Sequence, residues 1–345
     1  MPEWAKQEAV LLAWPHADSD WSSTLDDIEP VYCQLVLAIS RYQAVLILCL
    51  DTAHQAKIRH LLMAQSDTRF PVHFIHAAYD DTWIRDYGPL SCCRNNTVEL
   101  FNFRFNAWGD KFPSALDNAV NRQVEGQPHW PKAVMHDIDF VLEGGSIETD
   151  GLGTLLTTTQ CLLNPNRNPG YTKNQIVDKL SQTLGIERVL WLEHGYLAGD
   201  DTDSHIDTLA RFSNNNQIVY MSCEEDKDEH YTALKNMQKQ LQKFRSKDNT
   251  PYELIPIEIP PPIYHPEGYR LPASYANFLI INDAVLVPTY RSPEADEKAL
   301  ATLGKIFHDR QMVAIDCYPM IMQHGSLHCA TMQLYGQQCY PANKQ

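Results

Sequence analysis

The chain has 345 residues, of which 44% are hydrophobic and 21% charged, a composition typical of a globular protein with a large core. Its formal net charge of −15 argues against binding to nucleic acid or to an anionic membrane and is compatible with a small cationic substrate. Nine cysteines are too few for a disulfide scaffold, and neither a signal peptide nor a bilayer-spanning apolar segment is visible. We therefore expect a cytoplasmic protein, with reduced thiols at positions such as Cys33, Cys49 and Cys223.

The first eighty residues alternate between strand and helix patterns. Short apolar runs predict strands at 9–14, 45–50 and 72–75. Apolar residues at helical spacing predict a helix over 24–42, and Asp51 is a candidate N-cap for a second helix that runs to about residue 64. This alternation is typical of an α/β protein.

From residue 81 onward one pattern recurs five times. A polar motif on a predicted strand is followed by a turn and a second strand, and usually by a helix and another strand. The markers of the five motifs have spacings of 57, 62, 72 and 52 residues, and they are Asp86, Glu143, His205, Asn277 and Cys329. This loose period predicts repeated ββαβ units that bury a shared core. If the units surround an axis, their motifs meet at one central site.

The connecting elements follow from the same patterns. Helices are predicted at 172–184, where Gly185 is the stop signal, at 226–244, and from Ser292-Pro293 onward. Second strands are predicted at 97–103, from 154, at 217–221 and at 284–288. The proline-containing stretch 246–267 is interpreted as a long surface loop. Because no linker divides the chain, we predict one domain over residues 1–345.

Cys329 is the candidate nucleophile, because a thiolate attacks carbon well once a nearby positive charge lowers its pKa. A buried structural cysteine is the common alternative for any single thiol. His205 and Asp207 are two residues apart, so on a strand they share a face, while His328 and Cys329 point to opposite faces. We therefore expect His205, and not His328, to work with Cys329.

Three acids complete the candidate site, namely Asp86, Glu143 and Asp207. Taken alone, Asp86 is also typical of a turn with an Asp–Arg pair, Glu143 of a turn carboxylate, and Asp207 of a solvated or hydrogen-bonded strand pair with His205. Together with a thiol and an imidazole they suit a guanidinium, a planar cation that two carboxylates bind in bidentate fashion. The thiolate would attack the guanidinium carbon, and the imidazole would protonate the departing ammonia and then activate water.

Several motifs, taken in order, resemble the agmatine deiminase and bacterial peptidyl-arginine deiminase family of the guanidine-modifying penteins. They include Trp83-Ile-Arg-Asp-Tyr-Gly-Pro89, Phe105-Asn-Ala-Trp-Gly109, Glu143-Gly-Gly-Ser146, Asn164-Pro-Asn-Arg-Asn-Pro169, Ser204-His-Ile-Asp207 and His328-Cys329. The resemblance implies a five-bladed α/β propeller, no metal and no organic cofactor. Relatives suggest a homodimer.

The resemblance also implies roles for the site residues. Cys329 would form a covalent thiouronium intermediate, His205 would act as general acid and base, and Glu143 would support it. Asp86 and Asp207 would clamp the guanidinium. Trp83 and Trp108 match tryptophans that line the family's pocket, where an indole face can cover a cation or an alkyl chain.

Four residues depart from the family pattern. His324 and Ser326 stand in what is usually a run of glycines, Ser204 replaces the glycine before the histidine, and Asp110 replaces a second glycine after Ala-Trp-Gly. Where glycine is the usual residue, a side chain implies backbone strain.

Agmatine is the expected substrate, with N-carbamoylputrescine and ammonia as products. Acids beyond the clamp favour a dication, namely Asp80, Asp81, Asp201 and Asp203, and we count Asp203 as a candidate substrate-binding residue. Arg85 and Arg211 are expected to pair with neighbouring acids.

The alternative functions are deimination of arginine or peptidyl-arginine, amidinotransfer to an amine, and non-catalytic binding of a guanidine or polyamine. A metallohydrolase that uses His205, Asp207 and His328 is a further alternative, which the strand-face argument disfavours.

Overall fold

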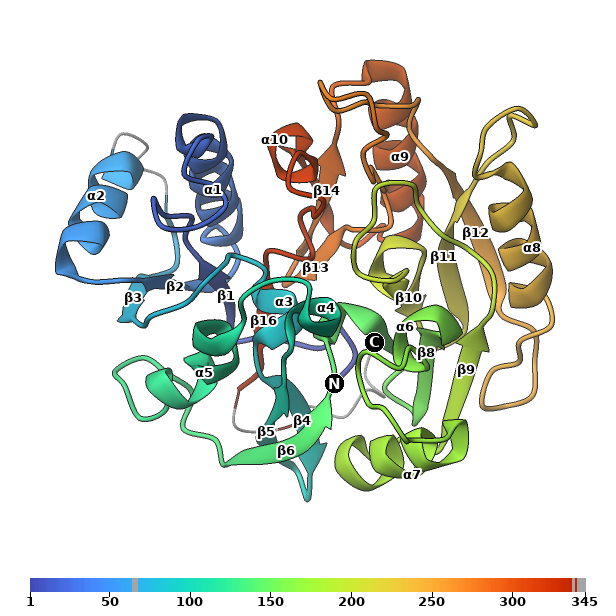
Figure 1. Ribbon diagram of the computed structural model, residues 1–345, viewed down its shortest axis with the longest axis horizontal. Helices are drawn as coiled ribbons and strands as arrows, with labels where there is room; N and C mark the ends of the chain where they lie inside the picture. Colours follow the sequence, from blue (N-terminus) through green and yellow to red (C-terminus); the bar gives the residue numbers. More distant parts are fainter. Residues whose placement is uncertain (64–67, 337–338, 340–345) are drawn as a thin grey trace.

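The structure is a computed structural model that describes residues 1–63, 68–336 and 339. In this part of the chain the strands form five separate sheets, one of four strands and four of three strands. Figure 1 shows the sheets arranged around the centre of the molecule, with the longer helices on the outside and the short helices α3 (Ile84–Tyr87) and α6 (Thr159–Leu162) near the middle. The fold is therefore α/β with mixed sheets, as the sequence predicted.

The first sheet joins the two ends of the chain. Its strand order is β16 (Met332–Leu334), β1 (Ala9–Ala13), β2 (Ala44–Cys49) and β3 (Val72–His76). The strands β1, β2 and β3 are parallel and are connected by α1 (Leu25–Ile39) and α2 (Thr52–Met63), whereas β16 is antiparallel to β1. These elements confirm the predicted strands and helices. The last residue predicted for α2, at position 64, lies outside the described residues.

The other four sheets share one topology, an antiparallel hairpin followed by a helix and a parallel third strand. This confirms the predicted ββαβ repeat, and the first sheet repeats it with β16 as its first strand. The strands are β4 (Leu90–Arg94), β5 (Thr97–Arg104), β6 (Met135–Val141), β7 (Ile147–Thr149), β8 (Thr154–Thr158), β9 (Arg188–Leu192), β10 (Ala210–Asn214), β11 (Gln217–Ser222), β12 (Glu253–Glu258), β13 (Leu279–Ile281), β14 (Ala284–Thr289) and β15 (Gln311–Asp316). The four crossover helices are α5 (Ala115–Val124), α7 (Lys173–Leu184), α8 (Tyr231–Leu241) and α9 (Pro293–Ile306).

The marker residues of the polar motifs do not lie on strands, so that part of the prediction was wrong, although the end of the third motif, Ala210 to Phe212, lies in β10. Three of them lie in or beside α3 (Ile84–Tyr87), η1 (Gly144–Ser146) and η2 (Ile206–Thr208), and Cys329 lies in a turn before β16. Their backbone amides bond to carbonyl groups two to four residues earlier, for example Asp86 to Trp83, Leu209 to Ile206 and Thr331 to His328. A strand needs a ladder partner, and these segments satisfy their backbone locally instead.

Two connections also differ from the prediction. The stretch 246–267 is not only a loop, because β12 within it pairs in parallel with β11 from Gln217↔Glu253 to Ser222↔Glu258. Pro256 is tolerated there because β12 is the edge strand of its sheet. The helix predicted at 226–244 is shorter, since α8 covers Tyr231–Leu241.

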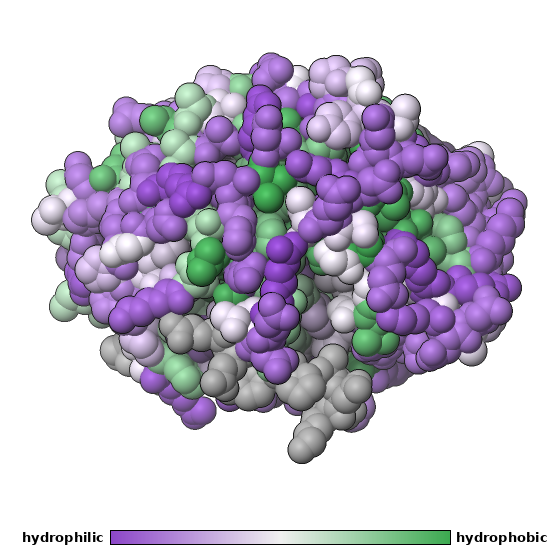
Figure 2. Space-filling model, turned by 90° about the horizontal axis from the view of Figure 1, so that it is seen from below, coloured by the Kyte–Doolittle hydropathy of each residue, from purple (hydrophilic) through white to green (hydrophobic). Residues whose placement is uncertain are grey.

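The apolar side chains gather inside the molecule, and the face in Figure 2 is mostly hydrophilic with scattered apolar areas. Within the described ranges, no helix has both the length and the apolar character needed to cross a membrane. Cys93 and Cys339 form a disulfide, which corrects the expectation of reduced thiols for this pair. Cys33, Cys49 and Cys223 are free and buried, as expected.

Candidate active site

Side chains from distant parts of the chain meet in a cavity of about 330 Å³. Cys329, His205 and Asp86 all line it, so the structure brings together the predicted nucleophile, the predicted acid–base residue and one predicted carboxylate. The other lining residues are Asp20, Asp81, Trp83, Trp108, Phe112, Asp200, Asp201, Thr202, Thr208, Gln323, His324 and Gly325.

Cys329 lies against one amide and one carboxylate. Its Sγ is 3.8 Å from Oδ2 of Asp207, and Nδ2 of Asn277 lies 3.4 Å from the same sulfur. Burial and the charges of Asp207 and Asp86 raise the pKa of the Cys329 thiol well above its ordinary value. A cation bound beside these carboxylates would offset their charge and favour the thiolate.

Asp86 is held by two donors. Its Oδ1 accepts from the backbone N–H of Gly145 at 2.9 Å, and its Oδ2 accepts from Nε1 of Trp108 at 2.9 Å. Burial raises the pKa of Asp86 to about 6. Gly145 is required at this point, because a Cβ there would lie 2.7 Å from Nδ1 of His205 and 2.8 Å from Oδ1 of Asp86.

Asp207 is fully buried, and its two oxygens have different environments. Nδ1 of His328 lies 2.8 Å from Oδ2, whereas Oδ1 has no hydrogen-bond partner among the described residues. Burial disfavours this charge, but the hydrogen bond from His328 and the charges of His328, His205 and Arg211 hold the pKa of Asp207 below its usual range. Asp207 therefore remains a carboxylate next to Cys329.

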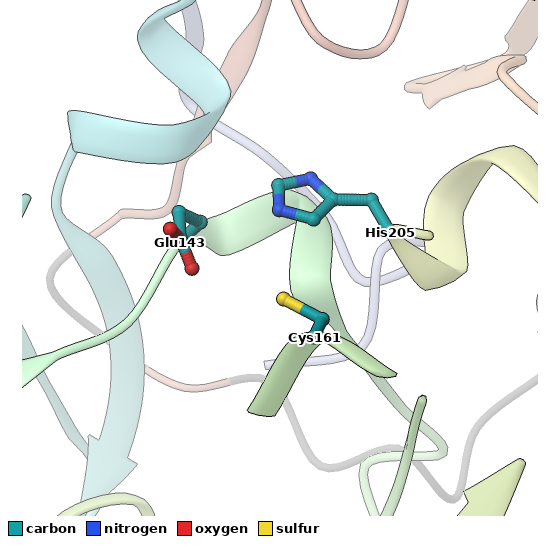
Figure 3. Close-up of side chains that lie close together, drawn as sticks. All are labelled: Glu143, Cys161 and His205. Carbon is teal, nitrogen blue, oxygen red and sulfur yellow. The ribbon is translucent and has the colours of Figure 1, made fainter. Parts of the chain in front are cut away.

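His205 lies between two acids and a second cysteine. Its Nδ1 is 3.7 Å from Oδ1 of Asp86, and in Figure 3 the side chains of His205, Glu143 and Cys161 point toward one another. Burial disfavours the charged ring, yet Asp86, Cys161 and Glu143 raise the pKa of His205 well above its usual value. The ring can therefore carry a proton and donate it to a leaving group.

Glu143, Cys161 and His205 also have the residue types of a metal site, with ligand atoms within 4.8 Å of one another. Arg167 already binds this glutamate, because its Nε lies 2.7 Å from Oε1 of Glu143. The guanidinium of Arg167 thus supplies the positive charge that a metal ion would bring to Glu143.

The two predicted tryptophans both line the cavity. Trp83 precedes α3 and packs against Trp21 with ring centroids 5.7 Å apart. Gly325 lets the chain pass Trp83 closely, because a Cβ at Gly325 would lie 2.3 Å from Cζ3 of the indole. The indoles therefore form two walls beside the thiol.

Not every predicted residue reaches the cavity. Asp203 is absent from the lining, and Arg167 and Lys111 bind its carboxylate, the latter at 3.2 Å. Arg211 pairs with acids as predicted, namely Glu3 and Glu148. Arg85 does not, since its Nη2 donates to Oε1 of Gln333 at 2.6 Å and its Nε to the carbonyl of His328.

Three residues at the site were not predicted as functional. Asn277 contacts Cys329, and its place as the fourth motif marker was a usable signal. Arg167 binds Glu143 and lies in a motif already noted, Asn164-Pro-Asn-Arg-Asn-Pro169. Nothing in the sequence marked Cys161, which lies beside His205, as functional except that it is a cysteine.

Three of the four departures from the family pattern have a left-handed backbone, with φ of 65° at His324, 65° at Ser204 and 61° at Asp110. This is the conformation that glycine adopts without a steric cost. Local contacts hold two of them. Ser204 N–H donates to Oδ2 of Asp200 at 2.7 Å, and Nδ1 of His324 lies 2.8 Å from the carbonyl of Gly199.

Comparison with known proteins gives one consistent family. The model of the Porphyromonas-type peptidyl-arginine deiminases matches residues 1–334. A solved agmatine deiminase from C. jejuni, a Cys-to-Ser variant with substrate bound, is 38% identical, covers 98% of this chain and 96% of its own, and has a TM-score of 0.90. A structure described as a putative arginine deiminase from Porphyromonas gingivalis is 42% identical, with 99% coverage of both chains and a TM-score of 0.89. A putative agmatine deiminase from Mycoplasma capricolum is 31% identical over 96% of this chain and 94% of its own length.

Proposed function

The chain belongs to the Porphyromonas-type peptidyl-arginine deiminase family, and from this premise we propose that it is an agmatine deiminase. It is a hydrolase of C–N bonds in linear amidines, and its substrate is a small cationic guanidine. The proposed reaction converts agmatine and water to N-carbamoylputrescine and ammonia. The observation that carries the proposal is the placement of the Cys329 thiol beside the Asp86 and Asp207 carboxylates, with His205 in the same cavity.

Binding prepares the nucleophile. The guanidinium offers five N–H donors in one plane, and a pair of fixed carboxylates holds such a group in one orientation. Because Asp86 and Asp207 raise the pKa of Cys329, a bound guanidinium that neutralises them makes the thiolate easier to form. The bound substrate thus favours formation of the thiolate that attacks it.

The chemistry then takes two steps. Sγ of Cys329 bonds to the guanidinium carbon, the C–N bond to one terminal nitrogen breaks, and that nitrogen leaves as ammonia with a proton from His205. A covalent thiouronium remains on Cys329. Water loses a proton to His205 and attacks the same carbon, the C–S bond breaks, and the ureido product leaves. The negative charge of Glu143 favours the protonated imidazole between these two proton transfers.

The cavity mouth supports agmatine over arginine. Asp81 and Asp201 line it, and among the described lining residues there is no lysine or arginine to receive a carboxylate. Burial raises the pKa of Asp81 to about 7, and burial and the neighbouring Asp200 raise that of Asp201, so these acids gain from a cationic partner. The ammonium of agmatine meets this need, whereas the carboxylate of arginine opposes it.

The test is ammonia release from agmatine, arginine and a peptide with a C-terminal arginine, measured side by side. We expect agmatine to exceed arginine in kcat/KM by at least about two orders of magnitude, because an unpaired desolvated carboxylate costs several kcal/mol. Equal rates on arginine, or a preference for the peptide, would overturn the substrate assignment. Ammonia release without an added amine excludes amidinotransfer, and turnover itself excludes a mere binding protein. Activity that survives a chelator excludes the metallohydrolase.

The remaining proposals concern architecture and context. The five sheets would be blades of a single-domain propeller over residues 1–345, which the shared ββαβ topology and the convergence of all five motifs support. We also propose a cytoplasmic homodimer, on the resemblance of the motifs to the family. Sedimentation of the purified chain tests the dimer.

A further inference from the structure

We infer that His328, held by Glu3, is a positioning residue that sets the carboxylate of Asp207 for the substrate guanidinium. The inference rests on the proposed function, because it concerns one of the two carboxylates that bind the guanidinium. It gives a role to a histidine that the chemistry at Cys329 leaves unused, and to a glutamate at the other end of the chain.

The first link joins His328 to Asp207. Nδ1 of His328 lies 2.8 Å from Oδ2 of Asp207, and both side chains are buried. Because Oδ2 has this partner and Oδ1 has none among the described residues, the two oxygens are not equivalent. A buried oxygen without a donor is the atom that a guanidinium N–H would satisfy. The imidazole thereby fixes the rotation of the carboxylate.

The second link joins His328 to Glu3. Nε2 of His328 lies 2.8 Å from Oε2 of Glu3, within hydrogen-bond distance. Glu3 is itself fixed, because Oε1 accepts from the backbone N–H of Ile280 at 2.7 Å and Oε2 accepts from Arg211 at 2.5 Å. With partners on both ring nitrogens, the imidazole cannot rotate without breaking two buried contacts.

Backbone hydrogen bonds connect His328, and with it the contacts to Asp207 and Glu3, to the nucleophile Cys329. Oδ1 of Asn277 accepts from the backbone N–H of His328 at 2.9 Å and from that of Cys329 at 3.4 Å. The two neighbouring side chains diverge, since Cys329 lines the substrate cavity and His328 lines a separate cavity of about 120 Å³. His328 therefore reaches Asp207 from the side of this second cavity.

Electrostatics explain why Asp207 needs this support. Asp86 and Glu143 place further negative charge around it, and in such a cluster one carboxylate ordinarily takes up a proton. A protonated Asp207 would lose its attraction for a guanidinium. The donor from His328 keeps Asp207 ionised, and its position leaves Oδ1 for the ligand.

A purely structural role for Glu3 is the rival explanation, because Glu3 also pairs with Arg211. Glu148 provides the matched control. It pairs with the same arginine, through Nε, but makes no hydrogen bond to His328. Glu148→Gln therefore weakens the support of Arg211 and leaves the contacts of His328 in place.

The experiment uses the full chain and two readouts. Agmatine affinity is measured by calorimetry in the Cys329→Ser background, where turnover is absent, and kcat/KM for agmatine is measured with Cys329 intact. The variants are His328→Ala, His328→Asn, Glu3→Gln and the control Glu148→Gln. Asparagine is informative because its amide nitrogen stands close to where Nδ1 was and retains a donor for Asp207. Thermal unfolding and the alkylation rate of Cys329 by iodoacetamide report on the fold and the thiol.

We expect His328→Ala to weaken agmatine binding and to lower kcat/KM by about 10- to 100-fold, the usual effect of losing a hydrogen bond to a charged group. His328→Asn should recover most of this loss, Glu3→Gln should fall between the two, and Glu148→Gln should stay within about twofold of wild type.

Equal agmatine affinity in His328→Ala and wild type would overturn the inference. So would equal losses in Glu3→Gln and Glu148→Gln. If His328→Ala does not fold, the comparison of His328→Asn with Glu3→Gln decides the question. Failure of the wild-type chain to bind agmatine would instead refute the proposed function.

Discussion

Two buried polar regions lie side by side in this protein, and they differ in how completely their hydrogen bonds are satisfied. The first comprises Asp86, His205 and Cys329 on the cavity floor, with Asp207 and Glu143 beside them. The second is the arginine cluster, formed by Arg211, Glu3 and Glu148 with the carbonyl groups of Ala276 and Phe278.

In the arginine cluster the donors of Arg211 are used. Nε binds Glu148, Nη2 binds Glu3, and Nη1 donates to the carbonyl groups of Ala276 and Phe278. In the first region, by contrast, both ring nitrogens of His205, Oδ1 of Asp207 and Oε2 of Glu143 have no hydrogen-bond partner among the described residues. Unpaired buried polar atoms are costly, so they persist where a ligand completes them. Of these two regions, the one with incomplete pairing is the one that holds the candidate nucleophile, and the one with complete pairing has a structural role.

The largest effect is expected from Cys329→Ser on the cavity floor. A serine hydroxyl is far less ionised than a thiol at neutral pH, so turnover should fall on the order of a thousandfold or more while the fold is kept. Steady-state ammonia release and urea unfolding measure the two quantities. Cys33→Ser, a buried cysteine in α1, is the control and should stay active. Residual activity in Cys329→Ser above about one per cent of wild type would count against a covalent mechanism.

Asp86→Asn and Asp207→Asn each remove one of the clamping charges. Each should cost about 3–5 kcal/mol of transition-state binding, because a buried cation is left with one carboxylate fewer. The measurement is kcat/KM for agmatine. Asp137→Asn is the control, since Asp137 binds Arg122 on the exposed surface and should leave kcat/KM unchanged. Near-normal kcat/KM in both cavity variants would refute the clamp.

Arg211→Met tests the other region, where the loss should appear in stability. The change leaves Glu3 and Glu148 without their shared cation, and breaking a buried ion pair costs about 3–5 kcal/mol in unfolding free energy. Urea unfolding gives this quantity. Arg122→Met, which removes exposed pairs with Glu125 and Asp137, should cost less than about 1 kcal/mol. Equal losses of unfolding free energy in Arg211→Met and Arg122→Met would show that the buried cluster stabilises the fold no more than the exposed pairs do.

The smallest effect concerns the rim of the cavity, at His324. Its φ of 65° suits glycine, so His324→Gly should be more stable than His324→Ala by about 1 kcal/mol, because both lose the imidazole but only alanine keeps the strained backbone. Thermal or urea unfolding of the pair isolates the strain. An alanine variant as stable as the glycine variant would show that the left-handed backbone there costs nothing.

The hairpins and outer helices could be predicted from the sequence because local physics decides them. Apolar runs set the strands, Gly185 ends α7 in the left-handed conformation, and Thr172 caps its start. The motif segments could not be predicted as turns, because polar residues in short runs have no period that separates a strand from a tight turn. The pairing of β16 with β1 depends on how the two ends of the chain meet, which no local pattern states.

The sequence indicated which residues gather at the site better than it indicated which side chains pair with them. Cys329, His205 and Asp86 line one cavity, and Asp207 and Glu143 lie beside Cys329 and His205 without lining it. Asp203 was predicted to bind substrate, and the structure places the amine of Lys111, far away in sequence, 3.2 Å from its carboxylate. An acid in a motif does not reveal whether a distant cation has already neutralised it. The same limit applies to His328, because its two acidic partners, Glu3 and Asp207, lie far from it in the sequence.

The central claim is that Cys329 forms a covalent bond to the guanidinium carbon. The most direct test is to quench the enzyme with acid during turnover of agmatine and to measure the mass of the peptide that contains Cys329. The account predicts an added amidino-derived group on Cys329 during turnover, and none in Cys329→Ser or after the substrate is exhausted. Unmodified Cys329 in repeated quenches, while ammonia is still being released, would contradict it.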